Sequence, residues 1–264
     1  MSTSDAAWRQ IFVLRWSPNR DVGAVLVSWV LVVAALYTAT VIVGQAVWGG
    51  IAYFLLYAVV GATLFGMGIP LYWTVVVRKR PVSDLGITRH KLGTSLLIQV
   101  VLAVLLYFAT LAQVTLPAWD VLVPLLALAL AIGFFEAVFW RGWTLLRLED
   151  AFGLLPAIVL GSALYAAYHI GYGMPGSEML FLFFIGILFA VVFRLTKSVF
   201  ILWPLFQPMG QLVTLIRDQL TLPLLAALGF AEVLVAMLVL VWLADRYHRR
   251  RQQGLLVRET GVNV

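Results

Sequence analysis

Long runs of apolar residues, interrupted by short polar or Gly/Pro segments, dominate the chain. A membrane-spanning helix needs about 20 consecutive, mainly apolar residues, and eight stretches approach or exceed that length. They cover residues 22–47, 51–77, 92–116, 119–146, 154–173, 179–195, 199–216 and 220–244. The pattern therefore predicts an all-α, polytopic membrane protein with about eight transmembrane helices joined by tight turns.

Composition supports this fold class and excludes several others. Apolar residues make up 63% of the 264 residues and charged residues only 11%, so a soluble fold could not cover its surface with polar groups. The absence of cysteine excludes a disulfide framework, a thiol nucleophile and thiolate metal ligands. The net charge of +6 is not arranged as a basic stripe with interleaved aromatic residues, so we expect no nucleic-acid partner.

The lysines and arginines are distributed unevenly over the loops, as the positive-inside rule describes. If residues 1–21 lie in the cytoplasm, 17 of the 18 basic residues fall on the cytoplasmic side, and Arg217 alone falls outside. We therefore expect a multi-pass protein of the cell membrane with both termini in the cytoplasm. The expected parts are a cytoplasmic segment at 1–21, a single eight-helix domain at 22–245 and a basic cytoplasmic tail at 246–264.

Polar side chains inside the spans are the candidates for chemistry, because ionisable groups at membrane depth are costly and usually face the interior of a bundle. These residues are Glu136, Arg141, His169, Gln207, Gln211 and Glu232. Glu136 precedes the turn near Gly153 by about as many residues as His169 follows it, which predicts one shared depth in an antiparallel hairpin. Such a pair can polarise a trapped water for hydrolysis. A Glu–His hydrogen bond that only joins two helices is an equally good interpretation.

Two short runs around these residues carry a family resemblance. The first run is Glu136-Ala137-Val138-Phe139-Trp140-Arg141-Gly142, and the second is Tyr165-Ala166-Ala167-Tyr168-His169. They resemble the motifs E-E-x-x-x-R, usually followed by glycine, and F-x-x-x-H of the CPBP intramembrane protease family, which contains type II CAAX prenyl endopeptidases and bacteriocin-processing or immunity proteins. The resemblance covers about residues 85–211 and extends to the eight-helix layout. It implies that Glu136 acts as general base on a water that His169 positions.

The chain also departs from these family motifs. Ala137 replaces the second glutamate of the first motif, and the third motif, H-x-x-x-N, is missing. The other two histidines, His90 and His248, lie in a loop and in the basic tail, where we interpret them as solvated surface residues. The asparagines of the chain are Asn19 and Asn263, so the seventh apolar stretch can supply neither residue of the third motif.

Two glutamines stand in the seventh stretch where the third motif is expected. Gln207 and Gln211 are spaced i, i+4 and therefore share one helical face. Gln207 aligns with the missing histidine, although Phe206 aligns almost as well. A glutamine can donate to an oxyanion but is a poor zinc ligand, and Glu136 and His169 are too few to hold a catalytic zinc. We therefore expect no metal and no cofactor.

Arg141 is expected to have a supporting role. It follows Glu136 by five residues, which on an α-helix is a rotation of about 140°, so the two do not share a face. Either Arg141 pairs with an acid of another helix, for which Glu232 is the other carboxylate well inside a span, or its guanidinium reaches the cytoplasmic interface. Both interpretations fit the sequence.

Two functions of different classes fit these residues. The first is a membrane-embedded, glutamate-dependent endopeptidase that cleaves a membrane-tethered peptide or protein, with Glu136 as base, His169 orienting the water and Gln207 as candidate oxyanion donor. The second is a catalytically silent relative that binds a membrane protein or lipid, as a scaffold or immunity factor does. The lost motif residues favour the second, and the matched depth of Glu136 and His169 favours the first. A transporter is a third option, but the sequence shows no inverted repeat, and we place the protease first.

Overall fold

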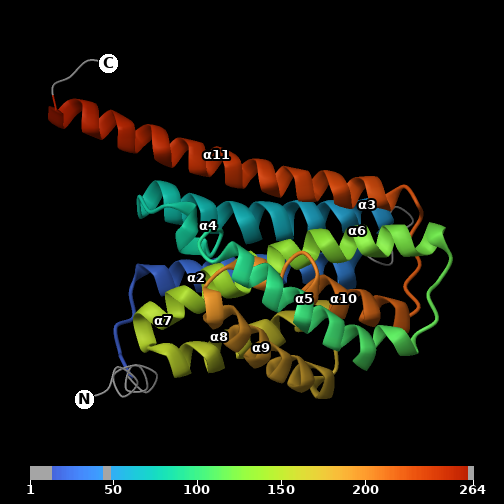
Figure 1. Ribbon diagram of the computed structural model, residues 1–264. Coiled ribbons are helices and arrows are strands. Elements are labelled where there is room, and N and C mark those ends of the chain that lie inside the picture. The colour runs from blue at the N-terminus through green and yellow to red at the C-terminus, as the bar shows by residue number, and fades with distance from the viewer. Residues whose placement is uncertain (1–13, 44–48, 261–264) are drawn as a thin grey trace.

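The computed structural model describes residues 14–43 and 49–260, and within these ranges every regular element is a helix (Figure 1). Seven helices in the described part are long and apolar enough to cross a membrane. They are Arg20–Val41, Gly50–Val77, Leu92–Gln113, Trp119–Phe152, Leu154–Tyr172, Gly176–Thr196 and Ala226–Gly254. The expected fold class, an all-α polytopic membrane protein, is confirmed. Parts of the expected N-terminal segment and basic tail, residues 1–13 and 261–264, lie outside the described residues.

The long helices contain α-helical, π-helical and 3₁₀ segments. The α-helices are α2 (Arg20–Tyr37), α3 (Gly49–Phe54), α4 (Ile69–Tyr72), α5 (Leu92–Ala109), α6 (Trp119–Glu136), α7 (Leu146–Phe152), α8 (Leu154–Tyr168), α9 (Gly176–Thr196), α10 (Phe206–Arg217) and α11 (Ala226–Thr260). The π-helical segments are Thr38–Val43, Leu55–Gly68, Trp73–Val77 and Ala137–Leu145. Short 3₁₀ turns cover Val82–Leu85, Leu111–Gln113, His169–Tyr172 and Val199–Ile201.

The seventh apolar stretch, at 199–216, does not form a full span. It begins with a 3₁₀ turn and continues as α10, whose 12 residues rise only about 18 Å against a hydrocarbon core of about 30 Å. Pro204 lies in the interruption, and proline lacks an N–H donor and restrains the residue before it from helical geometry. Pro208 lies in the first turn of α10, where backbone N–H groups have no partner within the helix. The result is a partial span that packs against α5 and α6.

The helix formed by α6 and the π-helical segment after it is the centre of the bundle. Every residue from 131 to 145 is buried. In Figure 1 this helix lies between α11 and the shorter α10, and it packs against both. The outer helices instead carry exposed apolar side chains, such as Leu97 on α5, Phe181 on α9 and Leu228 on α11. This distribution is typical of a bundle whose outer face contacts lipid and whose polar groups turn inward.

Ion pairs gather at segments that the sequence predicts to lie on one side of the membrane. The pairs are Arg78–Asp21 at 3.1 Å, Arg147–Asp150 at 3.3 Å and Arg194–Glu149 at 3.2 Å. Arg147 also donates to the backbone carbonyl of Asp84, at 3.0 Å. The start of α2, the loop after residue 77, the end of α7 and the end of α9 therefore meet at one end of the bundle.

We expect this end of the bundle to face the cytoplasm. Reporter fusions placed in the loop at residues 78–91 and after residue 246 should both give a cytoplasmic signal, because the lysines and arginines concentrate there. A fusion after Arg217 should give the opposite signal and serves as the internal control. An external signal from either of the first two positions would contradict the orientation.

Candidate active site

Glu136 is the last residue of α6, at the point where the helix becomes π-helical. Its side chain is buried, and the residue is only 6% exposed. Gln207 Nε2, on α10, donates a hydrogen bond of 2.8 Å to Glu136 Oε2. A buried carboxylate needs such a donor, because removing it from water without compensation is costly. The structure thus brings together two residues that the sequence singled out and that lie 71 positions apart.

This hydrogen bond depends on a close approach of α10 to α6. A Cβ atom at Gly133, one turn before Glu136, would lie 2.9 Å from the ring of Pro208 and 3.7 Å from Gln211 Oε1. Gln211 therefore lies at the same interface as Gln207, as their i, i+4 spacing predicts. Within the described residues, the buried Gln211 Oε1 has no hydrogen-bond partner.

His169 directly follows α8 and begins the 3₁₀ turn His169–Tyr172. It is buried, and its Nδ1 lies 2.9 Å from the backbone carbonyl oxygen of Tyr165. A carbonyl oxygen only accepts, so Nδ1 donates and Nε2 of the neutral ring keeps its lone pair. The rings of Tyr165, Tyr168 and Tyr172 pack around the imidazole at centroid distances of 5.2, 4.9 and 5.6 Å. The orientation of the ring is therefore fixed, with Nε2 as its available nitrogen.

The helix that contains Glu136 and the helix that leads to His169 form an antiparallel hairpin, and its register is the one that the sequence predicts. Trp140 packs against Tyr165 with ring centroids 5.5 Å apart. Trp140 lies four residues after Glu136, and Tyr165 lies four residues before His169, so this contact places Glu136 and His169 at about the same level. A water shared by the two side chains stays a prediction, since each makes its hydrogen bond with another group.

A cluster of three tyrosine hydroxyl groups, which the sequence did not predict, involves two of the tyrosines that pack against His169. Its members are Tyr57, Tyr168 and Tyr172. Tyr168 and Tyr172 join their hydroxyl groups at 3.1 Å, and both hydroxyls also bond to that of Tyr57 from the Leu55–Gly68 segment. The spacing of Tyr168 and Tyr172, i and i+4 around His169, was the available signal. Tyr57 gave none, because nothing in its surrounding apolar run predicts that it turns toward α8.

The position of Arg141 contradicts both interpretations drawn from the sequence. Its residue exposure is 1%, so it does not reach the interface, and its guanidinium lies 5.2 Å from the Tyr165 ring centroid and 5.8 Å from that of Phe189. It does not pair with Glu232, which is exposed on α11 because the face with Phe230 and Val233 turns inward instead. Cation–π contacts with α8 and α9 hold the buried charge.

The rotation expected between Glu136 and Arg141 was also wrong. The segment Ala137–Leu145 is π-helical, and its i→i+5 hydrogen bonding brings a residue five positions later back toward the same side of the helix. Arg141 therefore follows Glu136 by about one π turn.

The region that holds Glu136 and His169 also matches a known protein family. Residues 117–206 match a family model described as type II CAAX prenyl endopeptidase Rce1-like. The match covers about a third of the chain, and over that part the chain is similar to the CPBP intramembrane proteases. The matched residues run from the start of α6 to the first residue of α10 and contain Glu136, Arg141 and His169. No curated protein matches the chain significantly. The chain is therefore a CAAX-protease-like, multi-pass membrane protein.

The glycine after the arginine of the CPBP motif has a steric reason in this chain. A Cβ atom at Gly142 would collide with the backbone carbonyl of Leu85, in the 3₁₀ turn Val82–Leu85. Leu85 is itself fully buried. Gly142 thus lets the central helix contact the backbone of a loop that is remote in sequence.

Several buried polar atoms near the CPBP motifs lack partners among the residues that the structure describes. They are Trp140 Nε1, Arg141 Nη1, Ser162 Oγ, Gln207 Oε1 and Gln211 Oε1. Buried polar groups are normally satisfied by protein or ordered water, so these atoms have free hydrogen-bonding capacity. Across the described ranges, no cluster of three or more His, Cys, Asp or Glu side chains could hold a metal ion.

Proposed function

We propose that this protein is a membrane-embedded, glutamate-dependent endopeptidase that cleaves a membrane-tethered peptide or protein. The observation that carries the proposal is the buried Glu136, held by Gln207 and in register with a His169 ring whose Nε2 is available. We further propose that the protein lies in the cell membrane with both termini in the cytoplasm, as the distribution of basic residues predicts.

In the proposed reaction, a water lies between the Glu136 carboxylate and His169 Nε2. The carboxylate takes a proton from this water while its oxygen attacks the carbonyl carbon of the scissile peptide. His169 Nε2 accepts a hydrogen bond from the second O–H of the water, which stays intact, and so directs the attacking lone pair. Protonated Glu136 then returns its proton to the leaving amine as the C–N bond breaks, which restores the carboxylate.

The oxyanion formed in this reaction needs donors, and Gln207 and Arg141 can supply them. Gln207 Nε2 carries two N–H groups, and the bond to Glu136 uses one of them. Arg141 Nη1 is buried and free of hydrogen bonds within the described residues. A positive donor in a dry site stabilises developing negative charge strongly. We therefore assign Gln207 to positioning the base and, with Arg141, to the oxyanion.

The experiment that tests the function is cleavage of a candidate membrane substrate by the purified protein in liposomes. His169→Ala should lower the rate by roughly 10²-fold, because the water loses its second partner. His248→Ala, on the basic tail, is the matched control and should leave the rate unchanged. A chelator should also leave it unchanged, since too few ligands are present for catalytic zinc. Full activity of His169→Ala, or loss with chelator that zinc restores, would contradict this mechanism.

A silent scaffold that binds a membrane partner is the second candidate. It is favoured by Ala137, which is fully buried and places a methyl group where the family motif has its second carboxylate. In that case the liposome experiment would show substrate binding without cleavage, and the binding would be insensitive to Glu136→Gln.

A further inference from the structure

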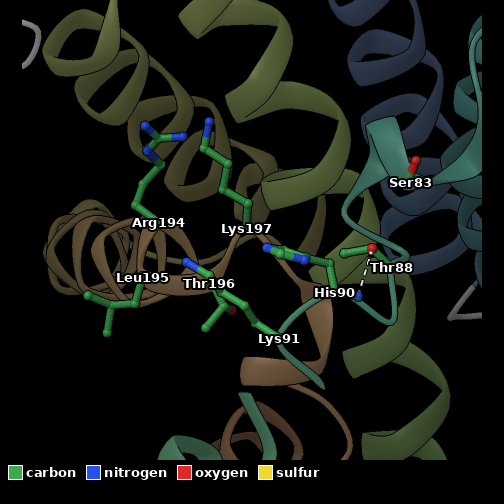
Figure 2. A pocket seen from close by; sticks show the side chains of 8 residues that line it. All are labelled: Ser83, Thr88, His90, Lys91, Arg194, Leu195, Thr196 and Lys197. Carbon is green, nitrogen blue, oxygen red and sulfur yellow. Dashed lines mark hydrogen bonds between the residues drawn. The ribbon is translucent and has the colours of Figure 1, made fainter. Parts of the chain in front are cut away.

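A second polar site, separate from Glu136, lies where the loop after residue 77 meets the end of α9. It is a pocket with a volume of about 270 Å³. Figure 2 shows that His90 and Lys91 from the loop, and Arg194 and Lys197 from the end of α9, are arranged around the same space. This is the end of the bundle at which the ion-paired loops meet, and none of its residues belongs to the proposed peptidase mechanism.

The pocket carries a net positive charge. Lys91 and Lys197 are exposed, and among the residues that the structure describes neither forms a salt bridge. Arg194 pairs with Glu149 at 3.2 Å, which offsets one positive charge. Two uncompensated lysines remain at one small pocket, and this arrangement favours an anion.

Buried donors at the pocket are unpartnered, and this observation is independent of its charge. Thr196 is only 4% exposed, yet its Oγ1 has no hydrogen-bond partner within the described ranges. The buried Nε and Nη1 atoms of Arg194 also have none there. Because buried donors are normally satisfied, a ligand with several acceptor oxygens fits this pocket. A phosphate group has that chemistry and the matching charge.

Backbone contacts hold the walls of the pocket in place. Val199 N donates to the carbonyl of Gly86 at 2.9 Å, which ties the loop to the segment after α9. His90 N donates to Thr88 Oγ1 at 3.1 Å within the loop (Figure 2). Both pocket lysines have left-handed backbone conformations, with φ of 53° at Lys91 and 54° at Lys197, which are uncommon outside glycine. The pocket is therefore formed before a ligand arrives.

We propose that this pocket binds the phosphate group of an anionic phospholipid. The pocket lies at the boundary of two spans, because Lys91 directly precedes α5 and Lys197 directly follows α9. Leu195 also lines it and is 56% exposed, so an acyl chain can continue from the bound phosphate along the apolar outer face. Basic pockets between helices on the cytoplasmic side are typical sites for anionic headgroups.

Binding of short-chain lipids to the purified full-length protein in detergent tests the proposal. Dioctanoyl phosphatidic acid should bind at least about tenfold more tightly than inorganic phosphate, and dioctanoyl glycerol, which has no phosphate, should not bind measurably. Thr196→Val should weaken phosphatidic acid binding by about tenfold, and Lys91→Gln combined with Lys197→Gln by about 10²-fold, at roughly tenfold for each charge-assisted contact.

The control removes a basic residue elsewhere. Arg250→Gln, on the exposed tail of α11, lowers the net charge without touching the pocket and should leave binding unchanged. Equal losses in Arg250→Gln and in the pocket variants would show nonspecific attraction and overturn the proposal. So would unchanged binding in the double lysine variant, which alters exposed side chains and should stay folded. Inorganic phosphate binding as tightly as the lipid would overturn the lipid assignment. The measurement does not involve proteolysis, so it stands whether or not the chain cleaves peptides.

Discussion

Replacing Glu136 with glutamine should lower the cleavage rate by about 10²- to 10⁴-fold, the usual contribution of a general base, while the bundle stays folded. Glutamine has nearly the volume of glutamate, and its Oε1 can still accept the hydrogen bond that Gln207 Nε2 now donates to the carboxylate. What it cannot do is take a proton from water. The loss should therefore appear in kcat, with little change in substrate binding.

The chain offers a matched control for this variant. Glu232→Gln makes the same chemical change at an exposed position of α11 and should leave the rate as it is in the unmodified protein. Gln207→Ala should give an intermediate loss, because the base remains but loses its positioning donor. Cleavage that survives Glu136→Gln would remove the assignment of Glu136 as base. Near-complete loss in Glu232→Gln would show that the assay reports general damage.

Most of the fold could be predicted from hydropathy, because lipid imposes a simple requirement. Every backbone polar group must be satisfied within its own segment, so a long apolar run in a membrane has little choice but a helix. The stretch at 199–216 escapes this argument. Its apolar count is sufficient for a span, but Pro204 interrupts it before α10 begins.

Features of the candidate site that follow from the number of residues on each side of a turn could be predicted from the sequence. Features that follow from local packing could not. Counting from the Gly153 turn placed Glu136 level with His169, and the Trp140–Tyr165 contact has that register. The partner of Gln207 was not predictable, since its amide reaches Glu136 through the close approach of α10 to α6. The side of the helix that Arg141 occupies was not predictable either. Apolar residues surround it in sequence, so no periodicity distinguishes a π-helix from an α-helix there.

Gly142→Ala should be the most destabilising single substitution of a glycine in the central helix. The added methyl group would collide with the carbonyl oxygen, carbonyl carbon and Cα of Leu85, so a side-chain rotation cannot relieve the overlap. The loop also cannot easily move away from Gly142, because the next residue, Gly86, has φ of +70° and packs against Phe193. Overpacking of this kind typically costs about 1–3 kcal/mol and sometimes more.

Thermal unfolding in detergent, followed by tryptophan fluorescence, measures this effect as a clear fall in Tm for Gly142→Ala. Gly93→Ala is the matched control: it lies in α5 with no atom within 4 Å of the added Cβ, and alanine is the better helix former by about 1 kcal/mol. It should therefore leave Tm unchanged or raise it slightly. If the two variants unfold at the same temperature, the central helix does not rest on the Leu85 backbone, and the steric reason given for the glycine of the motif fails. If Gly142→Ala alone is destabilised, the position of Arg141, the residue before it, depends on a loop more than 50 positions away in sequence.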